Sequence, residues 1–340
     1  MLNEFFMKHA RVQMPIDAVI GINYVCNSRC VMCDIWKVKK FPELPPEEYR
    51  KLPNTLRDIN ISGGETFLRK DIVDVIRVIH ETVPKARMVI STNGFMPALI
   101  ESQMKKILAV NPDIGVAISL DGVGEMHEQV RRIPDGYNKC IETLERLQSL
   151  GMKNLRFGFT IIPENVEHMS KVYDDAMKRG IQFTHSFAQG SDNYFGGAHI
   201  NNDPDLSELK KQYRHVISHE LKSWNLKRWL RAYFSYSLYN FINTKHQLLN
   251  NDPGTKFFFL HSNGVVYPSV VNNHEMGNIQ DVSSWDDLWY SAKADEARQN
   301  VQKDAHQAWM ICTARSAIKQ HPFRVASWIV KNKFGVIELE

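Results

Sequence analysis

Residues 17–33 read DAVIGINYVCNSRCVMC, and this stretch indicates the fold of the N-terminal half of the chain. Its first part, residues 18–23, is a short apolar run with β-branched side chains, which is typical of a buried strand. Its second part is a loop with three cysteines in the spacing Cys-x3-Cys-x2-Cys, at Cys26, Cys30 and Cys33. A strand that leads directly into reactive side chains is typical of parallel sheets, where functional groups gather at the carboxyl ends of the strands.

Outward from this stretch, β-rich runs alternate with segments of helical periodicity until about residue 186. Ile72, Val75, Ile76 and Ile79, for example, have the spacing of a helix that covers a sheet. The alternation predicts an α/β fold of six consecutive βα units with a parallel sheet. The strands are predicted at residues 18–23, 58–62, 88–91, 115–119, 157–161 and 182–186.

The pattern changes after residue 190. Aromatic helical sequence covers residues 206–249, and Asn263-Gly264 then marks a hairpin turn between two strands within residues 256–271. We therefore expect three parts: a βα body, a helical connection and a small α+β module made of a hairpin plus helices. Their expected bounds are residues 1–200, 201–250 and 251–340.

The composition excludes several classes of protein. With 43% hydrophobic and 24% charged residues and no low-complexity run, the chain is neither disordered nor fibrous. The net charge is only +4, with Lys and Arg spread along the chain, so we expect no nucleic-acid partner. The N-terminus lacks the apolar core of a signal peptide, and nowhere do about 18 uncharged apolar residues run together. A cytoplasmic protein is expected.

The cysteine loop predicts a metal centre. Only five cysteines occur in 340 residues, and three of them lie within eight residues, a poor pattern for disulfides. Three thiolates on one loop can bind three irons of a 4Fe-4S cluster and leave the fourth iron open. The alternatives are buried structural cysteines or a zinc site, but zinc usually takes four ligands in paired spacing and no second pair is present.

The loop, followed by Asp34-Ile35-Trp36, resembles the signature of the radical S-adenosylmethionine (SAM) superfamily. The resemblance implies one 4Fe-4S cluster on Cys26, Cys30 and Cys33, with SAM bound to the open iron. It also implies that an electron from the cluster cleaves SAM to methionine and a 5'-deoxyadenosyl radical, which abstracts hydrogen from carbon. A partial (β/α)6 TIM-like barrel is the fold expected for such a protein, and a flavodoxin or ferredoxin the expected type of reductant.

The same resemblance assigns SAM-binding positions near the ends of the later strands. Gly63-Gly64-Glu65 resembles the GGE motif of the family, in which glycines let the backbone approach the ligand. Asn93-Gly94 and Asp121-Gly122 are also ordinary turn dipeptides, and Arg131 fits a helix-surface charge equally well. The assigned positions are Ser62, Gly63, Gly64, Glu65, Thr92, Asn93, Ser119, Asp121, Arg131 and Thr160.

The C-terminal module resembles the SPASM or twitch extension of radical SAM enzymes, which normally binds auxiliary clusters. This chain has Ser269, Ala305 and Ala308 where similar proteins have cysteines, and only Cys312 remains. Hydroxyl and methyl groups do not replace thiolates, so we expect no auxiliary cluster. The replacements fit either natural loss or deliberate substitution. Cys312 is then a free thiol, which we expect to act catalytically as a hydrogen-atom donor.

We expect an enzyme of the oxidoreductase or isomerase type that acts on a small polar metabolite, such as a sugar, nucleoside or aminoglycoside, by epimerisation or dehydrogenation. Only about 16 residues precede the first strand, where many peptide-modifying relatives have a recognition domain. A maturase of a ribosomally made peptide and a non-catalytic iron-sulfur or SAM-binding protein are the alternatives. The basic aromatic stretches 226–241 and 323–334 leave membrane contact open, although such helices more often pack on their own domain.

Overall fold

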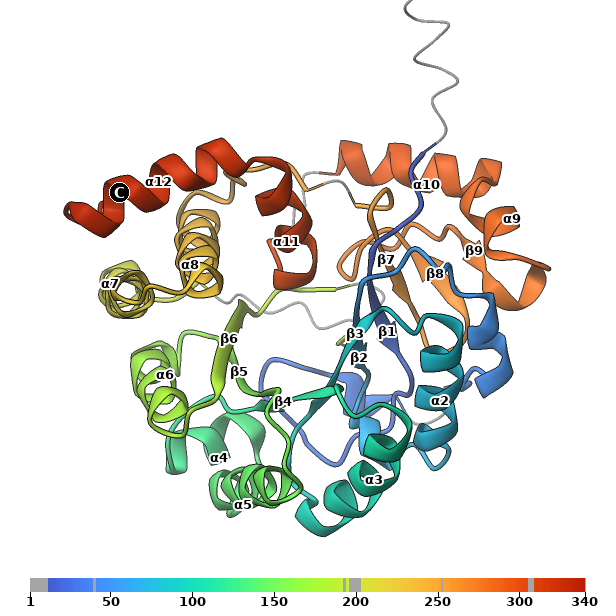
Figure 1. Cartoon of the computed structure of the whole chain (residues 1–340), viewed down its shortest axis with the longest axis horizontal. Coiled ribbons are helices and arrows are strands. Elements are labelled where there is room, and N and C mark those ends of the chain that lie inside the picture. Colours follow the sequence, from blue (N-terminus) through green and yellow to red (C-terminus); the bar gives the residue numbers. More distant parts are fainter. Residues whose placement is uncertain are drawn as a thin grey trace, which may run out of the picture.

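Six parallel strands form the N-terminal half of the molecule in the computed structural model (Figure 1). The structure describes residues 12–38, 41–191, 194–195, 203–251, 253–304 and 309–339, so Ala305 and Ala308 lie outside it. The strands are β1 (Asp17–Gly21), β2 (Asp58–Ser62), β3 (Arg87–Thr92), β4 (Gly115–Ser119), β5 (Leu155–Ile161) and β6 (Gln182–Phe187). Each pairs with its neighbour in chain order, which confirms the predicted partial barrel of βα units.

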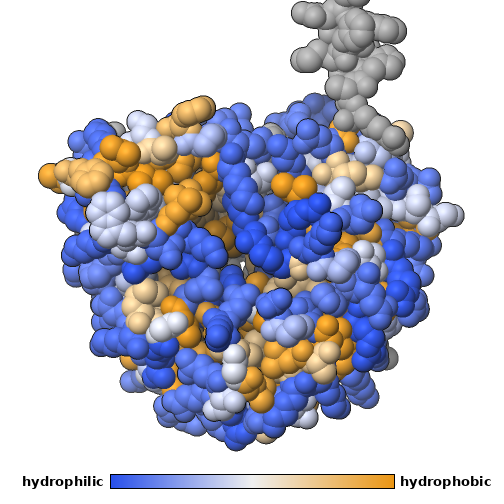
Figure 2. Space-filling view, in the orientation of Figure 1, coloured by the Kyte–Doolittle hydropathy of each residue, from blue (hydrophilic) through white to orange (hydrophobic). Residues whose placement is uncertain are grey.

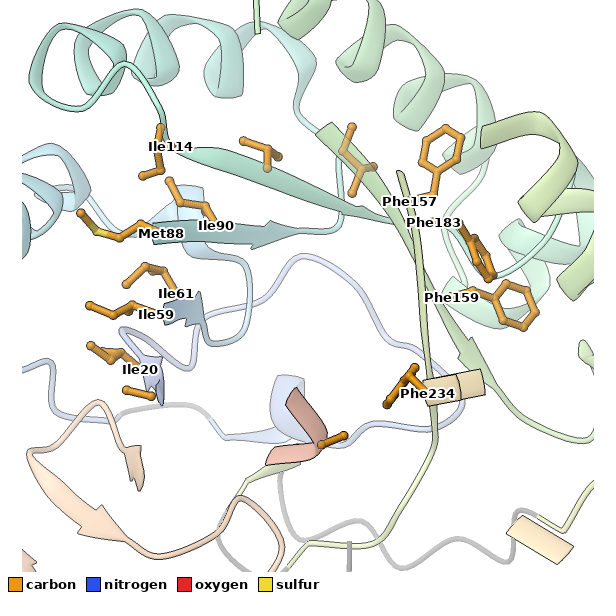
Figure 3. Packing of buried hydrophobic residues seen from close by; sticks show 14 of the residues in the cluster. Ile20, Ile59, Ile61, Met88, Ile90, Ile114, Phe157, Phe159, Phe183 and Phe234 are labelled. Atoms are coloured by element: carbon orange, nitrogen blue, oxygen red, sulfur yellow. The ribbon is translucent and has the colours of Figure 1, made fainter. Parts of the chain in front are cut away.

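Helices cover the outer face of this sheet (Figure 1). They are α2 (Ile72–Thr82), α3 (Pro97–Val110), α4 (Glu125–Arg131), α5 (Gly136–Ser149) and α6 (Met169–Lys178). Short 3-10 turns lie at Ile35–Lys37, Pro46–Lys51, Thr66–Leu68, Val166–His168 and Ile279–Asp281. Buried apolar side chains such as Ile59, Ile61, Met88 and Ile90 form the core of the barrel wall (Figure 3).

The side chains of each strand alternate between this core and the inside of the barrel. In β5, Leu155 and Phe157 are fully buried, whereas Arg156, Gly158 and Thr160 are half-buried and line an internal cavity. The alternation follows from the pleat of a strand, which directs successive side chains to opposite faces. Polar side chains at inward positions therefore reach the cavity, although apolar groups make up most of its lining.

The C-terminal hairpin is continuous with the barrel sheet. Strand β7 (Phe257–Leu260) pairs in parallel with β1, while β8 (Val265–Tyr267) and the short β9 (Gly277–Asn278) follow antiparallel. All four residues of β7 are buried, as expected for a strand covered on both faces. The predicted turn is confirmed, with Gly264 at a φ of +89° between the two hairpin strands. The pairing of β7 with β1 was not predicted, because register between distant strands leaves no local signal.

The remaining helices lie on the open side of the barrel or beside the C-terminal hairpin (Figure 1). They are α7 (Leu206–Lys222), α8 (Leu226–Thr244), α9 (Trp285–Trp289), α10 (Ala292–Lys303), α11 (Ile311–Gln320) and α12 (Pro322–Phe334). Helix α8 packs near β6, and α11 contacts both α8 and β1. In Figure 1, α11 therefore lies between the two edges of the six-stranded sheet. Its first residues, Ile311 and Cys312, line the barrel interior.

The two basic aromatic stretches differ in their packing. Helix α8 buries Tyr233, Phe234 and Phe241, so this stretch packs on its own molecule. Helix α12 leaves Phe323 and Phe334 on the surface, with exposed fractions of 89% and 73%. Among the helices that the structure describes, none is long and apolar enough to span a membrane.

Candidate functional site

One cavity of about 360 Å³ runs through the barrel interior from the cysteine loop toward the amino ends of the strands. Cys26, Cys30 and Cys33 all line it, and so does Cys312. Of the ten SAM-binding positions assigned from the sequence, Glu65 and Asp121 do not line the cavity. The other eight do: Ser62, Gly63, Gly64, Thr92, Asn93, Ser119, Arg131 and Thr160.

The two glycines after β2 let the backbone of this strand end contact the cysteine loop. The Gly64 N–H donates to the Asn23 carbonyl over 3.0 Å, and the Glu65 N–H donates to the Val25 carbonyl over 2.7 Å. A Cβ atom on Gly64 would lie 2.3 Å from the Val25 oxygen, and one on Gly63 would lie 2.5 Å from the Asn23 side chain. Because no side chain fits at that distance, glycine is required at both positions for this contact.

Glu65 joins three chain segments below the cavity surface. Its carboxylate accepts hydrogen bonds from the Thr92 hydroxyl over 2.8 Å, the Asn93 N–H over 2.7 Å and the Phe67 N–H over 3.1 Å. The Asn93 amide in turn donates to Asn27 in the cysteine loop over 2.6 Å. Burial raises the pKa of Glu65, and the hydrogen bonds act in the opposite direction. Glu65 therefore fixes Thr92 and Asn93 against the cysteine loop.

Arg131 and Asp121 form a second connection to the cysteine loop. Arg131 is buried rather than a surface charge, and its Nε donates to Asp121 Oδ2 over 2.5 Å. The Arg131 guanidinium also lies 3.6 Å from Cys30 Sγ, and the other Asp121 oxygen accepts from the Thr160 N–H over 2.7 Å. Burial alone would lower the pKa of Arg131, but Asp121 and Cys30 raise it. A permanent cation thus stands beside one thiol of the loop.

The three cysteines fit a cluster better than a single ion. Burial raises the pKa of Cys26 to about 11 and of Cys33 to about 12, so these thiols lose their protons only to a cation that binds them. No group of three or more His, Cys, Asp or Glu side chains in the described part of the chain is arranged around one ion. Ligands of a cubane bind separate irons and are farther apart, which agrees with three cysteines spread along one loop.

Two buried side chains at this end were not predicted as part of the site. Tyr194, from the loop after β6, donates to the Gly63 carbonyl over 3.0 Å and lies 2.8 Å from the Ser62 hydroxyl. His127 accepts from the Asp121 N–H over 3.0 Å, and burial lowers its pKa to about 3, so it is neutral. A lone Tyr or His in such segments carries no pattern that distinguishes it from other aromatic residues.

The fourth cysteine of the cavity lining is Cys312, which lies near Asp17 and Arg315. It is the second residue of α11 and lines the same cavity. Burial raises the pKa of Cys312 to about 12, so it is a protonated thiol at neutral pH. Ser269, at one expected auxiliary position, is buried and accepts a hydrogen bond from the Val271 N–H over 3.2 Å.

A family model matches the part of the chain that contains the cysteine loop. The model described as the Radical SAM superfamily matches residues 20–176, from β1 into α6. The chain carries a radical SAM domain. Proteins of this family bind a 4Fe-4S cluster and SAM. The cysteine loop lies within this domain, and the cavity is lined both by this domain and by later residues such as Cys312.

Curated relatives share this domain over part of their length. Fe-coproporphyrin III synthase of Methanosarcina barkeri is 30% identical over 196 residues, which are 55% of this chain and 47% of that protein. The sporulation killing factor maturation protein SkfB of Bacillus subtilis is 24% identical over 174 residues, 49% of this chain and 41% of that protein. The chain thus spans less than half the length of either relative.

Solved structures resemble more of the molecule. Streptococcus suis SuiB bound to S-adenosylmethionine covers 88% of this chain and 70% of its own, with a TM-score of 0.64 and 18% identity. The structure of anSMEcpe with bound AdoMet covers 92% of this chain and 98% of its own, with a TM-score of 0.61 and 16% identity. At these identities the likeness shows the fold, and it includes the C-terminal part beyond the radical SAM domain. The resemblance inferred from the sequence is confirmed.

Proposed function

We propose that this protein is a radical SAM enzyme that abstracts a hydrogen atom from a small polar metabolite inside the barrel. The observation that carries the proposal is the shared cavity. Three cysteines on one loop, eight SAM-binding positions and a protonated thiol all line the same internal space.

When bound, the 4Fe-4S cluster supplies the electron that cleaves SAM to methionine and a 5'-deoxyadenosyl radical. Cys26, Cys30 and Cys33 would hold the cluster, and the Arg131 cation beside Cys30 offsets part of the thiolate charge. Ser62, Thr92, Asn93, Ser119 and Thr160 line the cavity at four strand ends, where their polar groups would contact SAM. Since Glu65 fixes the end of β3 and Asp121 fixes Thr160 in β5 through hydrogen bonds, this part of the binding surface is preorganised.

Cys312 is the proposed hydrogen-atom donor. Its neutral thiol would give the S–H hydrogen atom to a substrate carbon radical, forming a C–H bond and leaving a thiyl radical. The reductant supplies the electron that restores the thiol, and solvent supplies the proton. We propose a flavodoxin or ferredoxin as this reductant. A cluster with cysteine ligands needs a reducing compartment, so we place the enzyme in the cytoplasm.

Polar side chains inside the barrel support the proposed substrate class. Asn60, Ser91, Thr184 and Ser186 add polar groups to the cavity wall, and α11 narrows the open side of the barrel. A sugar, nucleoside or aminoglycoside offers matching hydroxyl and amine groups. Epimerisation at a C–H bond is the outcome expected when Cys312 returns a hydrogen atom. Dehydrogenation would not use Cys312, because the substrate radical would instead give an electron to the oxidised cluster and a proton to solvent. We propose no nucleic-acid partner and no stable membrane attachment.

A ribosomally made peptide is the second candidate substrate. The fold of this chain resembles that of SuiB, which has been solved with its precursor peptide SuiA, over 88% of the chain. SkfB, a maturation protein, shares part of the radical SAM domain. A peptide substrate would have to place one side chain into the cavity, because the interior space of about 360 Å³ does not hold a folded segment.

The test is reductive SAM cleavage. The protein is reconstituted with iron and sulfide without oxygen, reduced and given SAM, and 5'-deoxyadenosine and iron per chain are measured. We expect 5'-deoxyadenosine and about four irons per chain. About eight irons would contradict the expected absence of an auxiliary cluster. A bound cluster without any 5'-deoxyadenosine would favour a non-catalytic iron-sulfur protein instead.

A further inference from the structure

The end of the cavity opposite the cysteine loop carries a group of charged side chains. Asp17, Asp58 and Arg87 begin β1, β2 and β3 and are direct partners in the strand register. Arg156 lies near the start of β5, and Arg315 reaches the same space from α11. All five line the cavity, and in Figure 2 the molecular surface is hollowed near the centre, beside α11, with hydrophilic residues around the hollow.

The two carboxylates of this group are already shared by two of its arginines. Asp58 Oδ1 lies 2.7 Å from Arg87 and 2.6 Å from Arg315. Asp17 lies 3.2 Å from the same Arg315 guanidinium. Burial nevertheless raises the pKa of Asp17 to about 6, which shows that Arg315 only partly offsets the cost of its charge. Both carboxylates are thus paired with Arg87 or Arg315, and among the described residues neither forms an ion pair with a third arginine.

Arg156 is the third arginine, and its charge is not matched. One of its terminal nitrogens donates to the neutral Asn154 side chain over 2.7 Å. Its Nε is buried and has no hydrogen-bond partner among the described residues, and no ion pair joins Arg156 to a carboxylate in that part of the chain. Burial lowers the pKa of Arg156 to about 10, and repulsion from Arg231, Arg315 and Arg87 acts in the same direction, whereas the attraction of Asp58 acts in the opposite direction and is the smallest of these effects.

A buried donor and an uncompensated cation both cost free energy unless a partner supplies an acceptor and a negative charge. Arg156 directs its guanidinium to the interior of the barrel because it alternates with the outward Leu155 and Phe157. We propose that the amino end of the cavity binds an anionic group of the substrate, a carboxylate or a phosphate, with Arg156 as its principal ligand. The planar guanidinium suits both groups, since each offers two oxygens to its parallel N–H donors.

This inference rests on the proposed function and narrows its substrate. Arg156 and Thr160 belong to the same strand and both face the cavity. Four residues of strand span roughly 13 Å, so the anion would lie about that far from the end where SAM binds. The substrate would therefore be a small acid or phosphorylated metabolite whose anionic group lies beyond the reacting carbon, on the side of the cavity that holds Cys312 and Arg315.

The experiment measures anion binding to the full, reconstituted chain in the absence of reductant. Inorganic phosphate, pyrophosphate and glutarate are titrated by calorimetry. We expect at least one of these probes to bind, and R156Q to weaken its affinity at least tenfold. R156K keeps the charge without the fork of donors, so it should bind more tightly than R156Q. R77Q is the matched control, because Arg77 pairs with Asp74 on the exposed face of α2, and its affinity should equal that of the unaltered protein.

The preferred probe distinguishes the two sources of the anion. Tighter binding of phosphate or pyrophosphate indicates a phosphorylated substrate, and tighter binding of glutarate indicates a carboxylate. The inference is overturned if none of the probes binds, or if R156Q and R156K, folded by their melting curves, bind as tightly as R77Q. Anion binding without 5'-deoxyadenosine formation would overturn the proposed function alone, whereas 5'-deoxyadenosine formation without Arg156-dependent binding would overturn this inference alone.

Discussion

The two ends of the cavity differ in how their charges are balanced. At the carboxyl end of the strands, Glu65 accepts three hydrogen bonds, and Asp121 neutralises Arg131 at 2.5 Å. At the amino end, Asp17 and Asp58 form ion pairs with Arg87 and Arg315. The buried Nε of Arg156 has no hydrogen-bond partner among the described residues. The charged side chains Glu65, Asp121 and Arg131 at the first end are paired within the protein, whereas Arg156 at the second end is not.

This difference indicates what each end is built to do. Groups that are fully hydrogen-bonded within the protein hold a fixed shape, which suits cofactors that must be bound in one geometry. Unmatched charge destabilises the free protein and is relieved when a ligand of opposite charge binds. We therefore expect changes at the carboxyl end to abolish cofactor binding, and changes at the amino end to alter substrate affinity and stability.

The largest effect is expected for Cys30→Ala. Two thiolates do not retain a 4Fe-4S cluster, so iron per chain should fall from about four to less than one and 5'-deoxyadenosine should disappear. Iron analysis and chromatography of the SAM products measure both. Cys140→Ala is the control, because Cys140 is buried in the core outside the cavity lining and should cost only about 1 kcal/mol of stability. Continued 5'-deoxyadenosine formation by Cys30→Ala would rule out the proposed role of the loop.

Gly64→Ala should have the next largest effect, because the new Cβ would overlap the Val25 oxygen at 2.3 Å. The end of β2 must then move away from the cysteine loop, and we expect a loss of roughly 3 kcal/mol in stability together with loss of SAM binding. Thermal melting and SAM titration measure these effects. Gly180→Ala gives the reference, since Gly180 has a φ of +68° but nothing within 4 Å of its Cβ position. Gly64 itself has no left-handed φ, so a loss in Gly64→Ala no larger than that in Gly180→Ala would show that the contact with the Val25 oxygen costs no more than backbone strain does elsewhere.

These two sites also show which parts of the molecule the sequence predicts. The cysteine loop, Gly63-Gly64-Glu65 and Asp121 are local patterns at strand ends, and the structure places them around one cavity or directly behind its wall. Tyr194 joins the site only through the path of a long loop, and no local pattern marks it. The residues themselves do not reveal such a contact, because it depends on the tertiary path of the chain.

The charged end of the cavity was missed for a related reason. Asp17, Asp58 and Arg87 are far apart in sequence and become neighbours only through strand register. A signal was nevertheless present, because Asp58, Asn60 and Ser62 alternate with isoleucines, and Arg156 and Thr160 share the same parity in β5. Polar residues at every second position of strands that are covered by helices indicate that polar groups lie inside the barrel.

The state of the Cys312 thiol can be tested without the substrate. With its pKa raised to about 12, Cys312 should react with iodoacetamide at pH 8 at least a hundredfold more slowly than the same cysteine in the denatured chain. Mass spectrometry of the labelled peptide follows the reaction, with the cluster bound so that the loop cysteines are protected. Rapid alkylation of Cys312 in the folded protein would mean an ionised thiol, and the proposal that it donates a hydrogen atom would fail.

The smallest effect concerns the pH dependence of stability at the amino end. Because burial raises the folded-state pKa of Asp17 from 3.8 to about 6, the folded protein retains a proton that the unfolded chain releases in this interval. Ionised Asp17 therefore costs stability, and the cost is absent below about pH 4 and complete above about pH 6. Asp17→Asn should gain roughly 2 kcal/mol relative to the unaltered protein between pH 4 and pH 7, after allowance for partial screening by Arg315. Denaturant melts at both values measure the gain, with the exposed Asp74→Asn as reference. If the stability difference does not change with pH, Arg315 fully compensates Asp17, and the unmatched charge at this end is confined to Arg156.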